Sequence, residues 1–288
     1  MSKISTVSNR LTTHDVQARK GGTPLVSLTA YTAPMAALLA PHSDVLLVGD
    51  SLGMVVHGLP DTLSVTPEMM ILHAQAVMRG VAQADLPDGQ KAPLVVVDLP
   101  FGSYEASPQV AYDTAVRVLK KTGADAVKLE TSAVMAETVA FLTARGVPVM
   151  GHVGLLPQAS RRDGGFRVKG KRQDQSQAVL ANAKAIEDAG AFALVIEGVT
   201  ESLATEITGA LHIPTIGIGA SAACDGQVLV VDDMLGMFAW TPKFVKPYGE
   251  IRQQITDAVA QYAADVRTRA FPSAQHCYQA RADLTSPA

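Results

Sequence analysis

The chain has 288 residues, of which 48% are hydrophobic and 18% charged, and this composition excludes a disordered or fibrous protein. Its 24 lysines and arginines stand against 27 aspartates and glutamates, so the net charge of -3 gives no general attraction to nucleic acid or to an anionic membrane. The length is enough to enclose one large hydrophobic core.

Short apolar runs recur along the chain, and most of them are followed by a helical pattern. Apolar residues occupy both faces of these runs, which is typical of parallel strands buried between a barrel interior and a shell of helices. Eight runs are strand candidates: residues 25–28, 45–48, 94–97, 126–129, 147–150, 193–196, 215–218 and 228–231.

The helices between these strands have recognisable ends. Thr66 before Pro67 supplies an N-cap and a proline at the first helical position, and Gly80 is expected to end that helix. Ser107 starts the next helix in the same way, with Gly123 as its stop. Further helices are expected within residues 132–145, 174–189, 200–208 and 250–268.

This alternation of strands and helices predicts parallel strands joined by right-handed crossovers. A doubly wound sheet would alternate in the same way, but eight strands favour an α/β fold of the (β/α)₈ TIM barrel type. Residues 21–270 contain no linker or low-complexity stretch. We therefore predict a single domain over residues 1–288, with an N-terminal helical extension at about 1–24 and a loosely packed tail at about 271–288.

The sequence also carries information on the cellular compartment. No run approaches the roughly 18 apolar residues that span a bilayer, and residues 1–20 lack the apolar segment of a secretory signal. The two cysteines, Cys224 and Cys277, are too few for a disulfide framework and lack metal-ligand spacing. We expect a cytoplasmic protein with no membrane or nucleic-acid partner.

Polar residues stand where the predicted strands end, which is where barrel enzymes place their active sites. Asp50, Asp98 and Glu130 each come at the end of a buried run. Any one of them alone could be a solvated residue at the start of a loop. Together they would repel one another unless a cation lies among them, and carboxylate oxygens without clustered histidines or cysteines favour Mg²⁺.

Three further side chains at strand ends have open roles. Lys128 faces the same side as Glu130, so it could neutralise an anionic substrate or pair with that glutamate. His152 could donate a hydrogen bond to a substrate oxygen or be a packed core histidine. Glu197 has no basic neighbour in the sequence and is a candidate general base, with a salt bridge to Lys128 or Arg167 as its structural alternative.

Two loops are also candidates for ligand contact. Residues 217–222 resemble a dinucleotide fingerprint only weakly, and we interpret them as a tight loop whose backbone closes over a ligand. Residues 161–167 are basic and glycine-rich, so they could form a lid, with solvated surface charge as the alternative.

Taken together, these segments resemble the ketopantoate hydroxymethyltransferase (3-methyl-2-oxobutanoate hydroxymethyltransferase) family, whose TIM barrels belong to the phosphoenolpyruvate mutase-like superfamily. The similar segments are spread in family order over about residues 25–250. They are LTAY at 28–31, VGDSLGM at 48–54, DLPFGSY at 98–104, VKLE at 127–130, GHVGLLPQ at 151–158 and IGIGA at 216–220.

The resemblance implies a Mg²⁺-dependent transfer of a hydroxymethyl group from 5,10-methylenetetrahydrofolate to 3-methyl-2-oxobutanoate (α-ketoisovalerate). The product is 2-dehydropantoate (ketopantoate), and the reaction opens pantothenate biosynthesis. A single Mg²⁺ per subunit would bind Asp50 and Asp98, and Glu130 would complete its shell directly or through water. The resemblance also implies a homo-oligomer, a decamer in many family members.

The substrate-binding and catalytic residues follow from the same resemblance. Asp50 and Asp98 would hold the oxo acid through the metal. Ser51, Lys128 and His152 would contact the oxo acid directly, and Glu197 would remove its C3 proton.

The chain departs from the family pattern at Thr32, where aspartate is frequent, and at Trp240, where histidine is frequent. Neither position is an assigned metal ligand or base, so the departures concern packing or folate contact rather than the reaction.

Two other interpretations stay open on sequence grounds. One is another metal-dependent enzyme of 2-oxo acid enolates from the same superfamily, such as a phosphoenolpyruvate mutase or an isocitrate lyase. Those enzymes typically use a loop cysteine, and neither Cys224 nor Cys277 lies in such a loop. The other is a non-catalytic barrel that only binds a metal or an oxo acid, for which convergent strand-end acids would be costly.

Overall fold

The computed structural model describes residues 9–279. Contacts divide the chain into two compact units, one of Met1–Val231 with Pro242–Val245 and one of Asp232–Thr241 with Lys246–Ala288. The single domain predicted over residues 1–288 stays a prediction. Parts of the predicted N-terminal extension and C-terminal tail, residues 1–8 and 280–288, lie outside the described residues.

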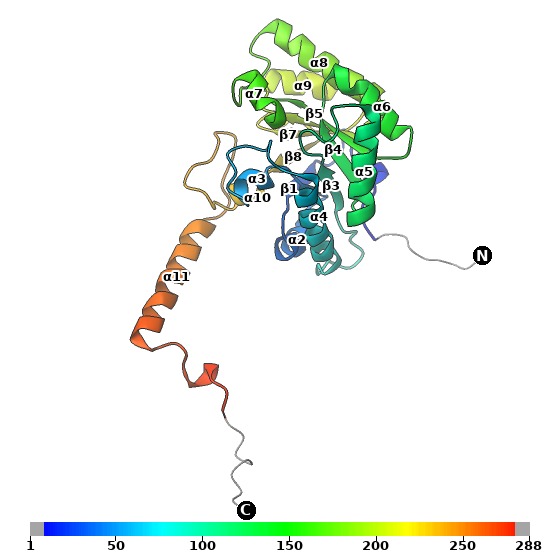
Figure 1. Ribbon diagram of the computed structural model, residues 1–288. Coiled ribbons are helices and arrows are strands. Elements are labelled where there is room, and N and C mark those ends of the chain that lie inside the picture. The colour runs from blue at the N-terminus through cyan, green and yellow to red at the C-terminus, as the bar shows by residue number, and fades with distance from the viewer. Residues whose placement is uncertain (1–8, 280–288) are drawn as a thin grey trace, which may run out of the picture. The chain divides into compact units, whose positions relative to one another are not determined.

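The first unit contains a closed barrel of eight parallel strands that follow one another in chain order, with β8 pairing with β1 (Figure 1). This confirms the predicted TIM barrel against the doubly wound alternative. The strands are β1 Leu25–Thr29, β2 Val45–Val48, β3 Leu94–Asp98, β4 Ala126–Glu130, β5 Val149–Gly154, β6 Ala193–Glu197, β7 Thr215–Ile218 and β8 Gly226–Leu229.

Helices surround the strands, as the predicted alternation requires (Figure 1). In the first unit they are α1 Thr13–Gln17, α2 Ala33–Leu39, α3 Leu52–Val55, α4 Pro67–Ala82, α5 Pro108–Thr122, α6 Ala136–Thr143, α7 Ser160–Asp163, α8 Gln173–Asp188 and α9 Glu201–Ala210. Short 3₁₀ turns η1 Ala40–His42, η2 Ala133–Met135 and η3 Pro157–Ala159 stand between them. The short helix α10 Val231–Met234 leads into the second unit, which holds α11 Ile251–Thr268 and η4 Ala274–His276.

Both predicted ends of α5 are confirmed; for α4 the predicted start at Thr66 and Pro67 is confirmed and the predicted stop at Gly80 is wrong. Ser107 caps α5, and Gly123 ends it with a left-handed φ of 72°. The helix α4, by contrast, continues past Gly80 to Ala82. A Cβ at position 80 would lie 2.1 Å from the carbonyl oxygen of Ala33. Gly80 is therefore a close-packing position between α4 and α2 rather than a helix stop.

The strands β1, β3, β4 and β6 each run one residue beyond their predicted ends, and β5 and β8 differ by more. The strand β5 starts two residues later than residue 147 and runs on to Gly154, so it includes His152. The strand β8 starts at Gly226, two residues before the predicted run, because Gly226 pairs with Leu25 of β1. Val231, which the apolar pattern placed in that strand, begins α10 instead.

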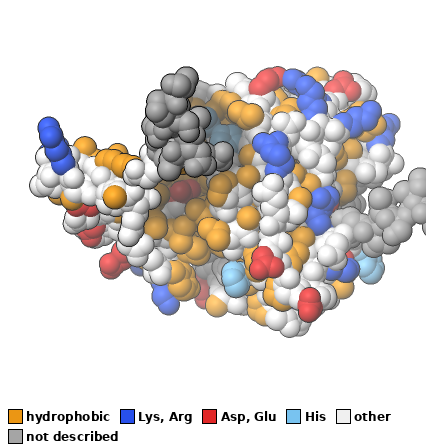
Figure 2. All heavy atoms as spheres, turned by 90° about the horizontal axis from the view of Figure 1, so that it is seen from below, with side chains coloured by type: hydrophobic (Ala, Val, Ile, Leu, Met, Phe, Trp, Pro, Cys, Tyr) orange, Lys and Arg blue, Asp and Glu red, His pale blue; other side chains and the backbone are white. Residues whose placement is uncertain are grey.

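The surface of the molecule is mixed in character. On the face drawn in Figure 2, lysine and arginine side chains are interspersed with acidic and hydrophobic ones. Within residues 9–279, no helix combines the length and the apolar character needed to cross a membrane.

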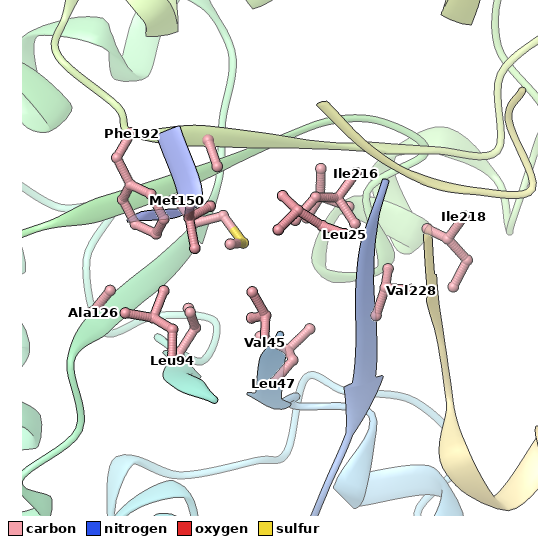
Figure 3. Close-up of a cluster of buried hydrophobic side chains, with 14 residues drawn as sticks. Leu25, Val45, Leu47, Leu94, Ala126, Met150, Phe192, Ile216, Ile218 and Val228 are labelled. Atoms are coloured by element: carbon pink, nitrogen blue, oxygen red, sulfur yellow. The ribbon is translucent and has the colours of Figure 1, made fainter. Parts of the chain in front are cut away.

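Buried hydrophobic side chains fill the interior of the barrel (Figure 3). They come from alternate positions of the strands, such as Val45 with Leu47 of β2 and Leu94 with Val96 of β3. Val16 of α1 joins this cluster, so α1 packs against the end of the barrel where the strands begin. The opposite end, where the strands finish, is left for polar side chains.

Candidate active site

Polar side chains meet at the C-terminal ends of neighbouring strands. Asp98 and Glu130 are the last residues of β3 and β4, and Asp50 follows β2 after one glycine. The parallel register aligns Asp98 with Lys128 and Glu130 with His152. All five side chains are buried. With Glu197, the last residue of β6, we call these six residues the strand-end cluster.

Two buried carboxylates share one lysine in this cluster. Oδ2 of Asp98 accepts a hydrogen bond from the backbone N–H of Asp50 at 3.1 Å, and Oδ1 lies 3.0 Å from Nζ of Lys128. Burial and then the charge of Asp98 raise the pKa of Asp50 to about 7, although Lys128 and Gln158 oppose this. Burial lowers the pKa of Lys128, but its carboxylate neighbours outweigh that effect and raise it. Lys128 is therefore a buried ammonium, paired with Asp98 rather than with Glu130.

A glutamine connects the carboxylates of two strand ends, Asp50 and Glu130. The backbone N–H of Gln158 in η3 donates to Oε1 of Glu130 at 2.9 Å, and its Nε2 donates to Oδ2 of Asp50 at 2.8 Å. The hydroxyl of Tyr104 donates to Oε1 of Gln158 at 2.6 Å. Burial, and then the charge of Asp50, raise the pKa of Glu130 well above its usual range. Gln158 and Tyr104 lie in the family-like segments, but a search for charged groups does not select them.

The second half of the cluster joins His152 to Glu197. Burial and then Lys128 lower the pKa of His152, so the ring is neutral at pH 7. Its Nδ1 lies 3.5 Å from Nζ of Lys128, and because an ammonium only donates, Nδ1 accepts and the ring proton is on Nε2. That Nε2 lies 3.3 Å from Oε2 of Glu197. The alternatives of a salt bridge from Glu197 to Lys128 or Arg167 are wrong: its close basic partner is His152.

The backbone around the cluster depends on glycines. Gly154, at the end of β5, has a φ of 102°, and a Cβ there would lie 2.2 Å from the carbonyl oxygen of Glu197. A side chain would therefore force the ends of β5 and β6 apart. Ser51 follows Asp50, and its Oγ lies 2.8 Å from the hydroxyl of Tyr31. The structure thus places every predicted site residue at the same end of the barrel.

The predicted metal ligands form a donor set of oxygens. Asp50 and Asp98 are buried side by side and have one lysine between them, so a divalent cation would offset their remaining charge. Oε1 of Glu130 is already used by Gln158. Across residues 9–279, no three His, Cys, Asp or Glu side chains are grouped as metal ligands. The residues fit a cation bound directly by the carboxylates of Asp50 and Asp98, with Glu130 further from it.

The two loops predicted to touch a ligand border surface hollows. Gly219 to Ala222 line a hollow of about 770 Å³, together with Gly198, Val199 and Phe244. The segment predicted as a lid is not a plain loop, because Ser160–Asp163 form α7 and Gly164 then takes a left-handed conformation. Val168, just after this segment, lines the same hollow. The hollow borders the end of β6, next to Glu197.

Known proteins are similar to this chain over nearly its whole length. Residues 10–274 match the model of a family described as ketopantoate hydroxymethyltransferase. The 3-methyl-2-oxobutanoate hydroxymethyltransferase of Phenylobacterium zucineum (strain HLK1) is 59% identical over 273 residues, 95% of this chain and 96% of that relative. The enzyme of the same name from Caulobacter vibrioides (strain NA1000 / CB15N) is 60% identical over 272 residues, 94% and 96% of the two chains.

Solved structures share the fold at much lower identity. A phosphonopyruvate hydrolase in complex with oxalate and Mg²⁺ is 13% identical, with a TM-score of 0.56 over 92% of this chain and 93% of that one. A phosphoenolpyruvate phosphomutase from Streptomyces platensis subsp. rosaceus is 12% identical, with a TM-score of 0.56 over 90% and 88%. These likenesses concern the fold alone and agree with the predicted (β/α)₈ barrel.

Proposed function

The chain belongs to the ketopantoate hydroxymethyltransferase family and transfers a hydroxymethyl group to 3-methyl-2-oxobutanoate from a one-carbon folate donor, and we propose that the strand-end cluster is where it does so. The finer parts of this proposal are the donor 5,10-methylenetetrahydrofolate, a single Mg²⁺ per subunit and the role of each residue. The observation that carries it is a line of close contacts from buried Asp98 through Lys128 and His152 to the partly exposed Glu197.

The reaction of the substrate determines which groups the site must supply. A new C–C bond at C3 of 3-methyl-2-oxobutanoate requires loss of the C3 proton, which leaves negative charge on the 2-oxo oxygen. A base must therefore stand near C3, and positive charge must stand near the oxygen. The enolate carbon then bonds to the methylene carbon of the folate donor. Both C–N bonds of that carbon break, and each returns its electron pair to nitrogen. One water is consumed, because its oxygen becomes the hydroxyl group of the product, and the C3 proton and one proton of the water end on the two nitrogens of the released tetrahydrofolate.

We assign the metal to Asp50 and Asp98, with Glu130 acting directly or through a water. When bound, Mg²⁺ would act as a Lewis acid toward the carboxylate and carbonyl oxygens of the oxo acid. The protein holds these acids in place through Gln158, which donates to both Asp50 and Glu130.

Lys128, His152 and Ser51 are the groups that hold the oxo acid. Lys128 stays protonated because three carboxylates surround it, so it stabilises a nearby oxyanion throughout the reaction. His152 is neutral, and its Nε2–H forms no hydrogen bond with the described residues. This N–H is therefore available to donate to an oxygen of the oxo acid.

Glu197 is the proposed base. Its side chain is 20% exposed, whereas that of His152 beside it is 2% exposed, so Glu197 is the more accessible member of the pair. Nε2 of His152 lies 3.3 Å from Oε2 of Glu197 but forms no hydrogen bond with the described residues, so both groups are available to a substrate. After accepting the C3 proton, Glu197 is neutral.

A coupled assay of 2-dehydropantoate formation tests this function. With 3-methyl-2-oxobutanoate, Mg²⁺ and methylenetetrahydrofolate, product should form, and chelation of the metal or omission of the folate should stop it. Cleavage of the oxo acid without folate would instead support the lyase or mutase alternative. Turnover that persists in excess chelator would contradict the metal assignment.

Two further parts of the proposal concern the whole protein. We place it in the cytoplasm, because its two cysteines are unpaired, one buried and one exposed, which suits a reducing compartment. We also propose a homo-oligomer, with the decamer of many family members as the expected size. The helix α11 supports an oligomer, since it buries no residue and carries exposed apolar side chains at Ile255, Val259, Tyr262 and Val266.

A further inference from the structure

A second hollow, of about 700 Å³, lies beside the first and is lined by charged side chains. Residues 161–174 hold six lysines and arginines and two aspartates, so this segment is positive within a chain of net charge -3. Four of the six basic side chains line the hollow. They are Arg167, Lys169, Lys171 and Arg172.

Part of this positive charge is free to bind a ligand. Lys169 pairs with Asp163, and Arg172 pairs with Asp174. Arg167 donates only to the carbonyl oxygen of Gly164. Within residues 9–279, neither Arg167 nor Lys171 forms an ion pair. Two exposed cations therefore line the hollow without an ion-pair partner among the described residues, and the one carboxylate in the lining, Asp163, is taken up by Arg162 and Lys169.

The start of α8 adds to the positive potential of this hollow. Arg172 is the N-cap residue of this helix of 16 residues and makes no side-chain cap hydrogen bond. The positive end of the helix dipole therefore coincides with the basic side chains. Both features favour a ligand with negative charge.

The position of the hollow connects it to the proposed active site. The backbone N–H of Lys169 donates to the carbonyl oxygen of Gly198 at 2.9 Å, and Gly198 directly follows Glu197. Val168 lines both this basic hollow and the more apolar hollow beside Gly198 and Phe244. A ligand that reacts near Glu197 could thus extend past Val168 into the basic hollow.

We propose that the basic hollow binds the glutamate carboxylates of the folate donor. The inference rests on the proposed function, which requires a folate in reach of Glu197. A folate carries at least two carboxylates at the end opposite its reacting ring, and each added γ-glutamyl residue contributes another. Arginine matches a carboxylate with two parallel N–H groups, and Lys171 adds a point charge. A volume of about 700 Å³ has room for more than one glutamyl residue.

The test replaces both free cations, as Arg167→Gln with Lys171→Gln, and compares donors that carry one and three glutamates. The KM for the triglutamyl donor should rise about tenfold and that for the monoglutamyl donor by less, because fewer carboxylates are lost from contact. Added salt should weaken triglutamyl binding in the wild type more than in the variant. The kcat value and the KM for the oxo acid should stay unchanged. The matched control, Lys184→Gln, removes an exposed lysine of the same helix α8 that does not line the hollow.

The outcomes separate this inference from the function on which it rests. An unchanged KM for the triglutamyl donor, or a rise independent of tail length, overturns the tail site. Exchange of the C3 hydrogen of the oxo acid needs no folate and should be unaffected by the double variant. If the wild type performs neither exchange nor transfer, the proposed function fails. In that case, calorimetry with tetrahydrofolate triglutamate still tests the hollow, because the double variant should bind this ligand more weakly than the wild type does.

Discussion

At the scale of single residues, the site depends on buried carboxylates that outnumber their cation. Asp50 and Asp98 share Lys128, and the pKa of Asp50 is raised to about 7 by burial and by the charge of Asp98. Such an arrangement is unfavourable for the fold unless binding uses it, since the charged form of Asp50 is penalised by its surroundings. This cost is the physical reason to expect a cation there.

Removing either carboxylate should remove the cation. We predict that Asp50→Asn or Asp98→Asn abolishes Mg²⁺ binding and nearly all activity, because each exchange deletes a charged oxygen and preserves the shape of the side chain. Titration calorimetry with Mg²⁺ measures the binding. The control is Asp188→Asn at the exposed end of α8. Wild-type Mg²⁺ affinity in both site variants would show that the metal binds elsewhere.

The charged members of the site were predictable from sequence, but their partners were not. Asp50, Asp98, Glu130 and Glu197 stand at strand ends, and a strand end can be read from an apolar run. Gln158 was not selected, because a neutral amide gives no signal of charge. It nevertheless donates to both Asp50 and Glu130.

The pairing of His152 with Glu197 was missed for a different reason. The contact depends on how β5 and β6 are aligned, and that register places Gly154 opposite Glu197. The apolar pattern of one strand does not show which of its residues pair with which residues of the neighbouring strand.

At the scale of elements, the alternation of strands and helices could be read from the sequence, and most errors lie at element ends. The sequence pattern predicts a helix stop at Gly80, whereas in the structure this glycine permits the close approach of α4 to Ala33. Glycine has two uses, a turn with positive φ and a tight contact, and only the structure distinguishes them. The bounds of β8 were shifted because its pairing with β1 begins at Gly226.

The short connection from β7 to β8 makes one carboxylate important for the fold. Residues 219–225 join these strands. Asp225 at the end of this connection accepts hydrogen bonds from the backbone N–H groups of Thr215 and Gly21 and pairs with Lys20 at 2.9 Å. It therefore fixes the segment before β1 and the start of β7 to the start of β8.

We predict that Asp225→Asn destabilises the fold by about 1–3 kcal/mol at pH 7, because charge-assisted hydrogen bonds are lost in a buried place. Burial acts to raise the pKa of Asp225, but the N–H groups of Thr215 and Gly21 and the charge of Lys20 outweigh it and lower the pKa. Because the pKa of Asp225 is lower in the folded protein than in the unfolded chain, its carboxylate stabilises the fold. This stabilisation is complete above the pKa of the unfolded chain, about 4, and is lost as the pH falls through the pKa of the folded protein.

Urea unfolding of the wild type and Asp225→Asn measures this difference. The difference in the free energy of unfolding between the wild type and the variant should be largest at pH 7 and should decrease below a pH of about 4. Asp188→Asn again serves as the surface control. Equal unfolding free energies at pH 7 would mean that the network around Asp225 contributes nothing to stability.

At the scale of the whole molecule, α11 leaves an apolar face exposed within its own unit. Ile255, Val259, Tyr262 and Val266 are spaced by three or four residues, so they share one side of the helix. An apolar face on a helix of 18 residues is unfavourable in water, so we expect another protein surface to cover it.

We predict an oligomer that depends on this face. Light scattering of the wild type at micromolar concentration should give a mass several times that of the 30.2 kDa chain. Val259→Glu with Tyr262→Glu should shift the protein toward smaller species, since charge would enter the apolar face. As a control, Gln253→Glu changes an exposed polar residue of the same helix. A wild-type mass of 30.2 kDa would refute the oligomer.

The central claim is that Glu197 removes the C3 proton in a step separate from one-carbon transfer. The most direct measurement is exchange of the C3 hydrogen of 3-methyl-2-oxobutanoate in deuterated water with Mg²⁺ and without folate. The wild type and the surface control Glu206→Gln should exchange. Glu197→Gln should bind the metal and the oxo acid but exchange about 10²–10⁴-fold more slowly, the usual share of a general base. Exchange by Glu197→Gln at the wild-type rate would contradict the account and assign the base to another group.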